Sequence, residues 1–135
     1  MSVHEPHNIK VKIYYEDTDA GGVVYYASYL RYLEMARMEF LSNRGIDIIG
    51  FHKRGIFFVV THLEISYKRP ARLGDVLTIT TEVVEIKNAS LRIKNQVLRD
   101  TELIAEALIT VACIENGRLR RLPDAFKNLT GRADN

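Results

Sequence analysis

A short loop with three acids and two adjacent glycines is the part of this 135-residue chain best suited to chemistry. It reads Glu16-Asp17-Thr18-Asp19-Ala20-Gly21-Gly22 and lies between a strand-like segment and a long amphipathic segment. An aspartate is ionised at neutral pH, so it can attack an acyl carbon or deprotonate a water molecule that does. Unpaired N–H groups at the start of the following helix would hold the oxyanion that develops. The loop therefore predicts acyl-transfer chemistry.

Residue types alone do not separate Asp17 from Asp19. Aspartate beside glycine is common in turns, and acids near a helix start favour its dipole, so both have a structural explanation. Gly21 and Gly22 would let the backbone approach a ligand without a Cβ in the way. A Ser/His/Asp hydrolase is disfavoured because no G-x-S-x-G sequence occurs. A phosphate-binding loop is disfavoured because the P-loop lysine and the dinucleotide-binding glycine spacing are both missing.

One helix and about five strands must position this loop, which predicts an α+β fold. The helix is expected over residues 28–44, with Ser28 as its N-cap and Gly45 as its left-handed terminating residue. Its apolar residues form one stripe, at positions 29, 30, 33, 36, 40 and 41. Strands are expected over residues 8–15, 57–68, 75–87, 91–100 and 102–115, a hairpin turn at Asn116-Gly117, and a helical turn within 124–130.

The strand at 102–115 is apolar on both faces, unlike a half-solvated antiparallel strand. One helix of about 17 residues covers only one face of a sheet, at about 1.5 Å per residue. A second subunit is the simplest cover for the other face. We therefore expect at least a dimer.

Composition excludes several classes of protein. A hydrophobic content of 47% and a charged content of 27% are typical of a single globular domain. The net charge of +2 is too small to predict nucleic-acid binding, although basic residues cluster at 68–72 and 118–121, where they would be solvated or meet a small anionic ligand. The sequence contains neither a signal-peptide pattern nor an 18-residue apolar run, so we expect a soluble, cytoplasmic protein without membrane insertion.

The histidines and the single cysteine do not indicate a metal site. The four histidines lack ligand-like spacing, and neither C-x-x-C nor H-E-x-x-H occurs. Cys113 lies within an apolar run and has no second cysteine to pair with. It is expected to be a small buried residue.

The loop and its surroundings closely resemble the hotdog-fold acyl-CoA thioesterases. Within these, the likeness is greatest to the 4-hydroxybenzoyl-CoA thioesterase-like group, which includes the bacterial Tol-Pal-associated YbgC-type enzymes. The matching residues are Tyr15 to Tyr25 of the acidic loop, Ala27-Ser28-Tyr29, Glu34-x-Ala36-Arg37, Tyr67-x-x-Pro70-Ala71-Arg72-Leu73-Gly74-Asp75 and Leu122-Pro123. The resemblance spans about residues 8–128.

The resemblance implies one hotdog thioesterase domain over residues 1–135, with 1–7 and 131–135 as loose tails. A long central helix would be wrapped by an antiparallel sheet, and two subunits would pair edge to edge into one continuous sheet. Dimers would pair again into a homotetramer, with active sites at the subunit interface. The partners implied are an acyl-CoA substrate and, as a further candidate, an acyl carrier protein. No metal and no cofactor beyond the CoA of the substrate are expected.

The resemblance also assigns residues. The catalytic aspartate falls on Asp19, as nucleophile or general base, and the oxyanion donor is the backbone N–H of Tyr26. Asp17 would support the loop. Substrate binding, including the CoA phosphates, would involve Tyr15, Gly22, Lys87, Ser90, Arg118 and Arg120.

Position 26 departs from one branch of the family. Many YbgC-type sequences have histidine where this chain has Tyr26, whereas the hydroxybenzoyl-CoA branch has tyrosine. Tyrosine cannot replace histidine as a base at neutral pH, so the chemistry rests on Asp19 and the backbone donors. An alternative is a non-catalytic subunit that binds acyl-CoA or an acyl carrier protein for lipid synthesis. A dehydratase on the same fold is disfavoured because no histidine lies near Asp19 in the sequence.

Overall fold

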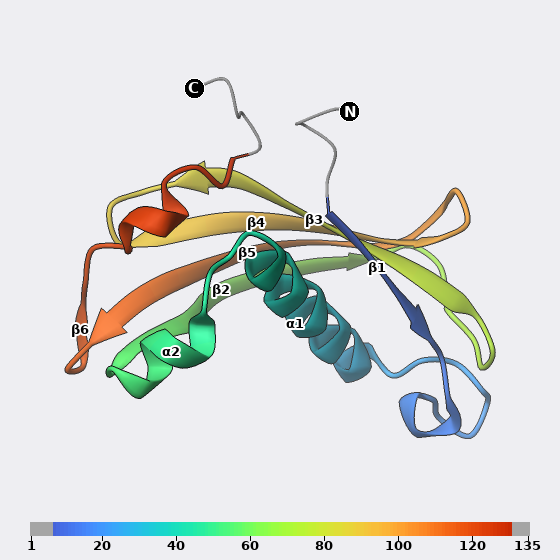
Figure 1. Ribbon diagram of the computed structural model, residues 1–135. Coiled ribbons are helices and arrows are strands. Elements are labelled where there is room, and N and C mark those ends of the chain that lie inside the picture. Colours follow the sequence, from blue (N-terminus) through green and yellow to red (C-terminus); the bar gives the residue numbers. More distant parts are fainter. Residues whose placement is uncertain (1–6, 131–135) are drawn as a thin grey trace.

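A computed structural model describes residues 7–130 of the chain (Figure 1). Of the tails expected at 1–7 and 131–135, residues 1–6 and 131–135 lie outside the described residues, and the expectation is wrong for His7, which belongs to the first strand. The elements are, in order, β1 (His7–Lys12), the 3-10 turn η1 (Tyr15–Asp17), α1 (Tyr26–Asn43), α2 (Ile48–Lys53), β2 (Ile56–Tyr67), β3 (Val76–Ile86), β4 (Ser90–Arg99), β5 (Glu102–Glu115), β6 (Arg118–Leu119) and the 3-10 turn η2 (Asp124–Phe126).

The strands form one curved antiparallel sheet in the order β1-β3-β4-β5-β2, and β6 pairs with the end of β5. Helix α1 lies across the concave face of this sheet (Figure 1). The acidic loop is at one end of the sheet, whereas α2 and β6 are at the other end (Figure 1). The predicted helix and antiparallel sheet are confirmed, and β6 adds a sixth, two-residue strand.

The core lies between the inner face of α1 and the sheet. Six residues of α1 are buried, namely Tyr29, Tyr32, Leu33, Ala36, Phe40 and Leu41. They pack with inward-facing apolar residues of β3, β4 and β5 such as Ile79, Ile93 and Ile109. The predicted stripe was wrong at Leu30, which is exposed, and omitted Tyr32, which is fully buried.

Helix α1 begins two residues earlier than predicted, and Ser28 is not its N-cap. The N-cap is Tyr25, which makes no side-chain cap hydrogen bond. The carbonyl oxygen of Asp17 accepts hydrogen bonds from the Tyr25 N–H at 3.0 Å and from the Ser28 hydroxyl at 3.3 Å. The acidic loop therefore sets where the helix starts.

One other predicted boundary was wrong, and one short helix was missed. β1 ends at Lys12, not at residue 15, because the chain turns into η1. Helix α2 was not predicted at all; the Asp47 side chain accepts the Gly50 N–H at its N-terminus, and a six-residue helix is too short to show a clear period.

Strand β2 is an edge strand with many exposed side chains. It pairs with β5 on one side and with no strand of residues 7–130 on the other. A bulge between Val60 and His62 interrupts the alternation of its side chains between the two faces of the sheet. Its exposed apolar residues are Phe57, Val60, Leu63 and Tyr67. This edge is therefore a long, partly apolar surface within one chain.

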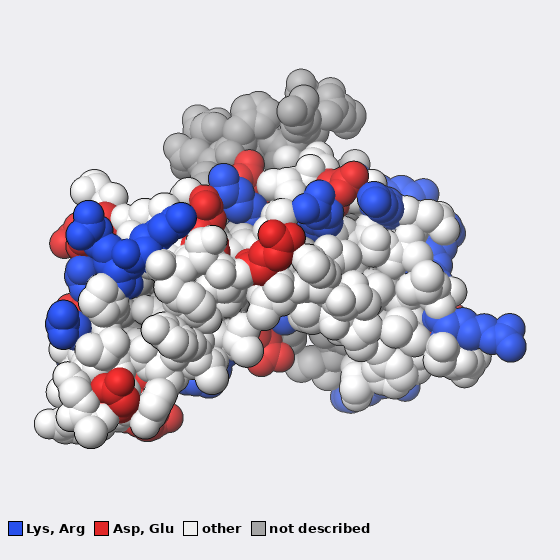
Figure 2. All heavy atoms as spheres, turned by 180° about the vertical axis from the view of Figure 1, so that it is seen from behind, with Lys and Arg blue, Asp and Glu red and all other residues white. Residues whose placement is uncertain are grey.

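The side of the molecule turned away in Figure 1 carries Lys and Arg side chains at both ends and charges of both signs along its upper middle, whereas other residues fill most of its lower middle (Figure 2). The second apolar face predicted for β5 is only partly open, because Ile104 and Ala112 are buried and Leu108 is half-buried. None of the helices between residues 7 and 130 combines the length and apolar character needed to cross a membrane.

Candidate active site

Asp19 holds its carboxylate in a tight turn of its own loop. Its Oδ1 accepts the N–H groups of Gly21 at 2.9 Å and Val23 at 3.2 Å. The Gly22 N–H donates to the Asp19 carbonyl at 3.0 Å, and Gly22 has a φ of +77° that L side chains rarely adopt. The other oxygen, Oδ2, accepts no hydrogen bond from residues 7–130. The exposed carboxylate is thus oriented by one oxygen while the second remains available.

Asp17 has a different environment. Its side chain is buried, with only 2% of the residue exposed. Its carboxylate accepts the Tyr14 N–H at 3.0 Å and pairs with the Arg31 guanidinium at 2.5 Å. Burial, followed by the charge of Asp17, raises the pKa of the nearby Tyr32. Asp17 therefore anchors the acidic loop to α1.

The first turn of α1 presents free N–H groups. The Ser28 N–H donates to the Tyr25 carbonyl at 3.0 Å. Within residues 7–130, neither the Tyr26 N–H nor the Ala27 N–H has a hydrogen-bond acceptor, as expected for the first positions of a helix. The Tyr26 side chain is largely exposed, at 71%. The site thus combines a carboxylate with unpaired helix N–H donors that follow it in the chain.

The segment at residues 69–75 is joined to the acidic loop by backbone hydrogen bonds. The Val24 N–H donates to the Ala71 carbonyl at 2.9 Å, and the Leu73 N–H donates to the Gly22 carbonyl at 2.9 Å. Val23 also forms an isolated bridge with Arg72. Family likeness pointed to this segment, but no local pattern showed that it would bind the acidic loop.

A cluster of tyrosines lies against the helix start. The Tyr67 hydroxyl donates to the Tyr26 carbonyl at 3.3 Å, and the two ring centroids are 4.7 Å apart. Tyr29 contacts Tyr67 edge-on at 5.3 Å. Burial raises the pKa of both Tyr29 and Tyr67, so neither is a base at neutral pH. The contact between Tyr67 and Tyr26 was missed by sequence reasoning because 41 residues separate the two.

A family model described as the thioesterase-like superfamily matches residues 14–129. The chain belongs to this superfamily.

Similar proteins agree with this membership. The chain is 40% identical over 117 residues to an acyl-CoA thioesterase YbgC of Haemophilus influenzae, covering 86% of this chain and 85% of that protein. A probable thioesterase from Bartonella henselae has a TM-score of 0.83 at 35% identity, covering 87% of this chain and 99% of the other. A Thermus thermophilus thioesterase complexed with coenzyme A and zinc has a TM-score of 0.80 at 30% identity, covering 94% and 93%. The hotdog fold expected from the sequence is confirmed.

The predicted substrate-binding residues of this thioesterase-like domain fall into two groups. Tyr15, which is 79% exposed, and Gly22 lie in or beside the Asp19 loop. Four lie at the opposite end of the sheet, namely Lys87, Ser90, Arg118 and Arg120. The backbone N–H of Arg120 donates to the Cys113 carbonyl on β5, and Tyr67 pairs with Ala105 on the same strand. At about 3.3 Å per residue, these two points are roughly 26 Å apart. One chain does not bring the two groups together.

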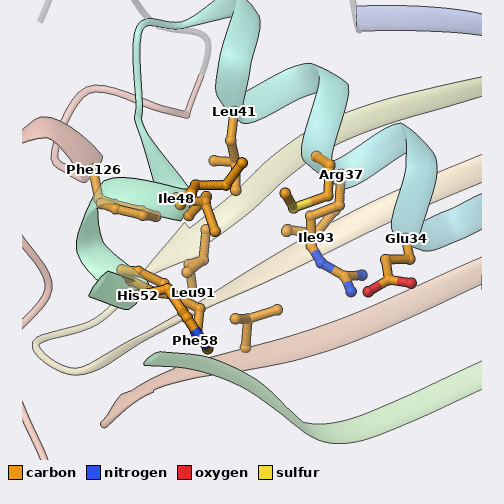
Figure 3. Close-up of a pocket in the computed structure, with 12 residues that line it drawn as sticks. Glu34, Arg37, Leu41, Ile48, His52, Phe58, Leu91, Ile93 and Phe126 are labelled. Carbon is orange, nitrogen blue, oxygen red and sulfur yellow. The ribbon is translucent and has the colours of Figure 1, made fainter. Parts of the chain in front are cut away.

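An apolar cavity of about 310 Å³ lies at that far end, between α1, α2 and the sheet (Figure 3). Phe58 and Phe126 stack at 4.9 Å in its wall, and Glu34 and Arg37 face it from α1. Burial lowers the pKa of Arg37, although the charge of Glu34 opposes this. Phe58 lines this cavity, whereas Tyr25, Tyr26, Tyr29 and Phe57 do not.

Residues 7–130 hold no cluster of three or more His, Cys, Asp or Glu side chains that could bind a metal ion.

Proposed function

We propose that this chain hydrolyses acyl-CoA thioesters to a free acid and CoA, with Asp19 as the catalytic carboxylate. Relatives such as the YbgC protein of Haemophilus influenzae, named an acyl-CoA thioesterase, support the reaction. The observation that carries the residue assignment is the Asp19 carboxylate, oriented by two amides on Oδ1, in the loop that leads into unpaired N–H groups of α1.

Two reaction routes would use the Asp19 carboxylate. In the first, a carboxylate oxygen of Asp19 attacks the thioester carbon, the C–S bond breaks, CoA leaves as a thiolate, and water hydrolyses the mixed anhydride. In the second, the carboxylate takes a proton from a water molecule whose oxygen attacks that carbon, and CoA leaves as the tetrahedral intermediate collapses. In both, the Tyr26 N–H donates to the oxyanion, and removing such a donor typically costs about 3 kcal/mol.

The test is Asp19→Asn, which keeps the shape of the side chain and removes its charge. We expect the variant to lose about 10³-fold or more in kcat, by comparison with other essential catalytic groups, on a panel of aliphatic and aromatic acyl-CoAs read by free thiol. Glu82→Gln, at an exposed acid on β3, is the matched control and should retain activity. Full activity in Asp19→Asn would contradict the assignment. Binding of acyl-CoA without turnover by the wild type would favour a non-catalytic acyl-CoA or acyl-carrier-protein subunit.

The proposal includes a homodimer that pairs two β2 edges. A long edge strand with exposed apolar residues is normally covered, because its free N–H and C=O groups invite pairing. Antiparallel pairing about a two-fold axis would set the Ile56 end of one β2 beside the Tyr67 end of the other. Arg118 and Arg120 of the partner subunit would then approach Asp19 and meet the CoA phosphates. This arrangement would join the two groups of residues that one chain keeps roughly 26 Å apart, at about 3.3 Å per residue of strand.

Mixing two defective variants tests this arrangement. Asp19→Asn lacks the carboxylate, and the double variant Arg118→Glu with Arg120→Glu weakens CoA binding. When the two are unfolded together and refolded, a heterodimer has one site with both defects and one with neither, so activity should exceed that of either parent. Activity that never exceeds the better parent would rule out a shared site.

We further propose that two dimers associate through the outer face of the sheet, where Leu108 is half-buried. Light scattering should then give the mass of four chains, and Leu108→Lys should reduce it to two. A mass of two chains for the wild type would remove the tetramer from the proposal. A cytoplasmic location follows from the acyl-CoA substrate and is tested by cell fractionation.

A further inference from the structure

Tyr67 is the last residue of β2, and its side chain reaches the first turn of α1. It touches Tyr26 at two points. Its hydroxyl donates to the Tyr26 carbonyl at 3.3 Å, and its ring lies 4.7 Å from the Tyr26 ring, tilted by 41°. On its other side the Tyr29 ring, which belongs to the core, holds it at 5.3 Å. The strand end, the core and the helix start therefore meet at one side chain.

These contacts bear on the two unpaired N–H groups. Tyr26 is the first residue of the helix, so no bond within the helix fixes its N–H direction. A tyrosine that holds both the carbonyl and the ring of Tyr26 limits rotation of that residue. The carbonyl of Tyr26 and the N–H of Ala27 belong to the same peptide group. Donation to the carbonyl polarises this peptide and makes its N–H a stronger donor.

We infer that the Ala27 N–H joins the Tyr26 N–H as an oxyanion donor, and that Tyr67 is a positioning residue for both: it fixes the Tyr26 backbone and strengthens the Ala27 N–H through the shared peptide. The inference rests on the proposed function, because it assumes that an oxyanion develops at this helix start. In this role Tyr67 acts through its hydroxyl hydrogen on the Tyr26 carbonyl.

The hydroxyl must remain protonated for this role. Burial, together with the neighbouring Tyr26, raises the pKa of Tyr67 above that of free tyrosine. Tyr67 therefore stays a donor over the whole neutral range, and its effect on catalysis is constant there.

Tyr67→Phe is the direct test, because it keeps the ring contacts and removes only the hydroxyl. One hydrogen bond strengthens the next by about 10–30%, and only this difference acts on the oxyanion donor, so we expect kcat to fall about twofold to sevenfold with KM within about twofold. The melting temperature should fall by no more than about 3–4 °C. Ser66→Ala, which removes an exposed hydroxyl from the preceding residue of the same strand, is the matched control and should match the wild type.

Two ketone analogues separate an oxyanion effect from a general disturbance. Trifluoroacetonyl-CoA is hydrated at its ketone and resembles the tetrahedral intermediate, whereas acetonyl-CoA resembles the substrate. Tyr67→Phe should lose the same factor in affinity for the fluorinated compound as it loses in kcat, and keep its affinity for the other. Equal losses for both compounds, or an unchanged kcat, would overturn the inference.

A 3-fluorotyrosine at position 67 gives an answer even if Tyr67→Phe folds poorly. Fluorine lowers the hydroxyl pKa, so the donor is lost at a lower pH than in the wild type. The alkaline side of the kcat profile should therefore move to lower pH, and identical profiles would count against the role. Asp19→Asn distinguishes the two levels of the argument. If it is inactive while Tyr67→Phe is normal, only this inference fails; if it is active, the proposed function itself fails.

Discussion

Replacing Arg99 with methionine should weaken the segment that supports the Asp19 loop. The Arg99 guanidinium donates to Asp75 at 2.7 Å, to the Pro70 carbonyl at 3.2 Å and to Glu102 at 2.8 Å. The same Asp75 oxygen accepts the Arg72 N–H at 2.9 Å. Arg99 thus ties both ends of the 69–75 segment to the end of β4. Methionine keeps much of the length of the side chain and removes every one of these bonds.

The exposure of the groups sets the size of the effect. The Arg99 and Asp75 side chains are 27% and 22% exposed, so water screens their attraction only in part. A charge-assisted hydrogen bond in such a place contributes about 1.5 kcal/mol. The ion pair of Arg99 with the more exposed Glu102 adds about 0.5 kcal/mol. The free energy of unfolding should therefore fall by about 2 kcal/mol, which lowers the melting temperature by about 6–8 °C in a domain of this size.

The effect should depend on pH in one direction. Burial raises the pKa of Asp75, but hydrogen bonds from the Arg72 N–H and the Arg99 guanidinium outweigh burial and hold it below its usual value. A carboxyl with a lowered pKa stabilises the fold above the unfolded value of about 3.9, and this contribution is lost as pH falls through the folded pKa. The difference in melting temperature between wild type and variant should have its largest value near about pH 7 and should shrink below about pH 4.

Thermal unfolding followed by circular dichroism measures this gap, at one protein concentration because association shifts melting temperatures. Arg92→Met is the control, since Arg92 pairs with Glu85 at 3.5 Å and both side chains are more than 40% exposed. It should change stability by less than about 0.5 kcal/mol. The reasoning is refuted if Arg99→Met has the melting temperature of the wild type at neutral pH, or if the difference in melting temperature is as large near about pH 3 as at neutral pH.

Two further predictions concern the Asp19 loop and the far end of the sheet. Gly22→Ala places a Cβ at a φ of +77° and should cost about 1–2 kcal/mol in urea unfolding, with a loss in kcat/KM because the turn orients Asp19. Gly21→Ala, whose Cβ would meet Asp19 Oδ1 at an ordinary 3.4 Å, should cost less, and equal costs would show that backbone strain is not the cause. Phe126→Ala removes a side chain that is 1% exposed and stacked on Phe58, so it should cost about 3–5 kcal/mol. Leu119→Ala, at a residue that is 71% exposed, should stay within about 0.5 kcal/mol, and a similar loss in both variants would contradict the packing argument.

Strands with clear alternation and turn residues were predicted within one or two residues. β3, β4 and β5 are bounded by Gly74, Asn88 and Asp100, so their ends were visible locally. The hairpin at Asn116-Gly117 formed as expected, with both residues at positive φ. The start of α1 was misplaced because contacts from Asp17 decide it, and no spacing within the helix reveals those contacts.

Sequence spacing alone could not separate Asp17 from Asp19, and family likeness was needed. The physical reason is visible only in three dimensions, since Arg31 lies 14 residues after Asp17 and pairs with it on α1. The separation of Asp19 and Arg118 also depends on topology, because the pairing of the strands decides at which end of the sheet each residue lies. Local patterns therefore predicted the elements, whereas the roles of individual charges depended on how those elements pack.

The burial of Cys113 has a practical value for measurement. It is the only cysteine of the sequence, it is fully buried, and burial raises the pKa of its thiol, so the reactive thiolate is scarce in the folded protein. The wild type should therefore add little background when released CoA is titrated with a thiol reagent. A cysteine introduced at the exposed Glu82 on β3, away from the β2 edge, would be the one fast-reacting thiol, ready for a spin label or a fluorophore without removal of any native cysteine. Label-to-label distances would then report directly on how two copies of the chain meet.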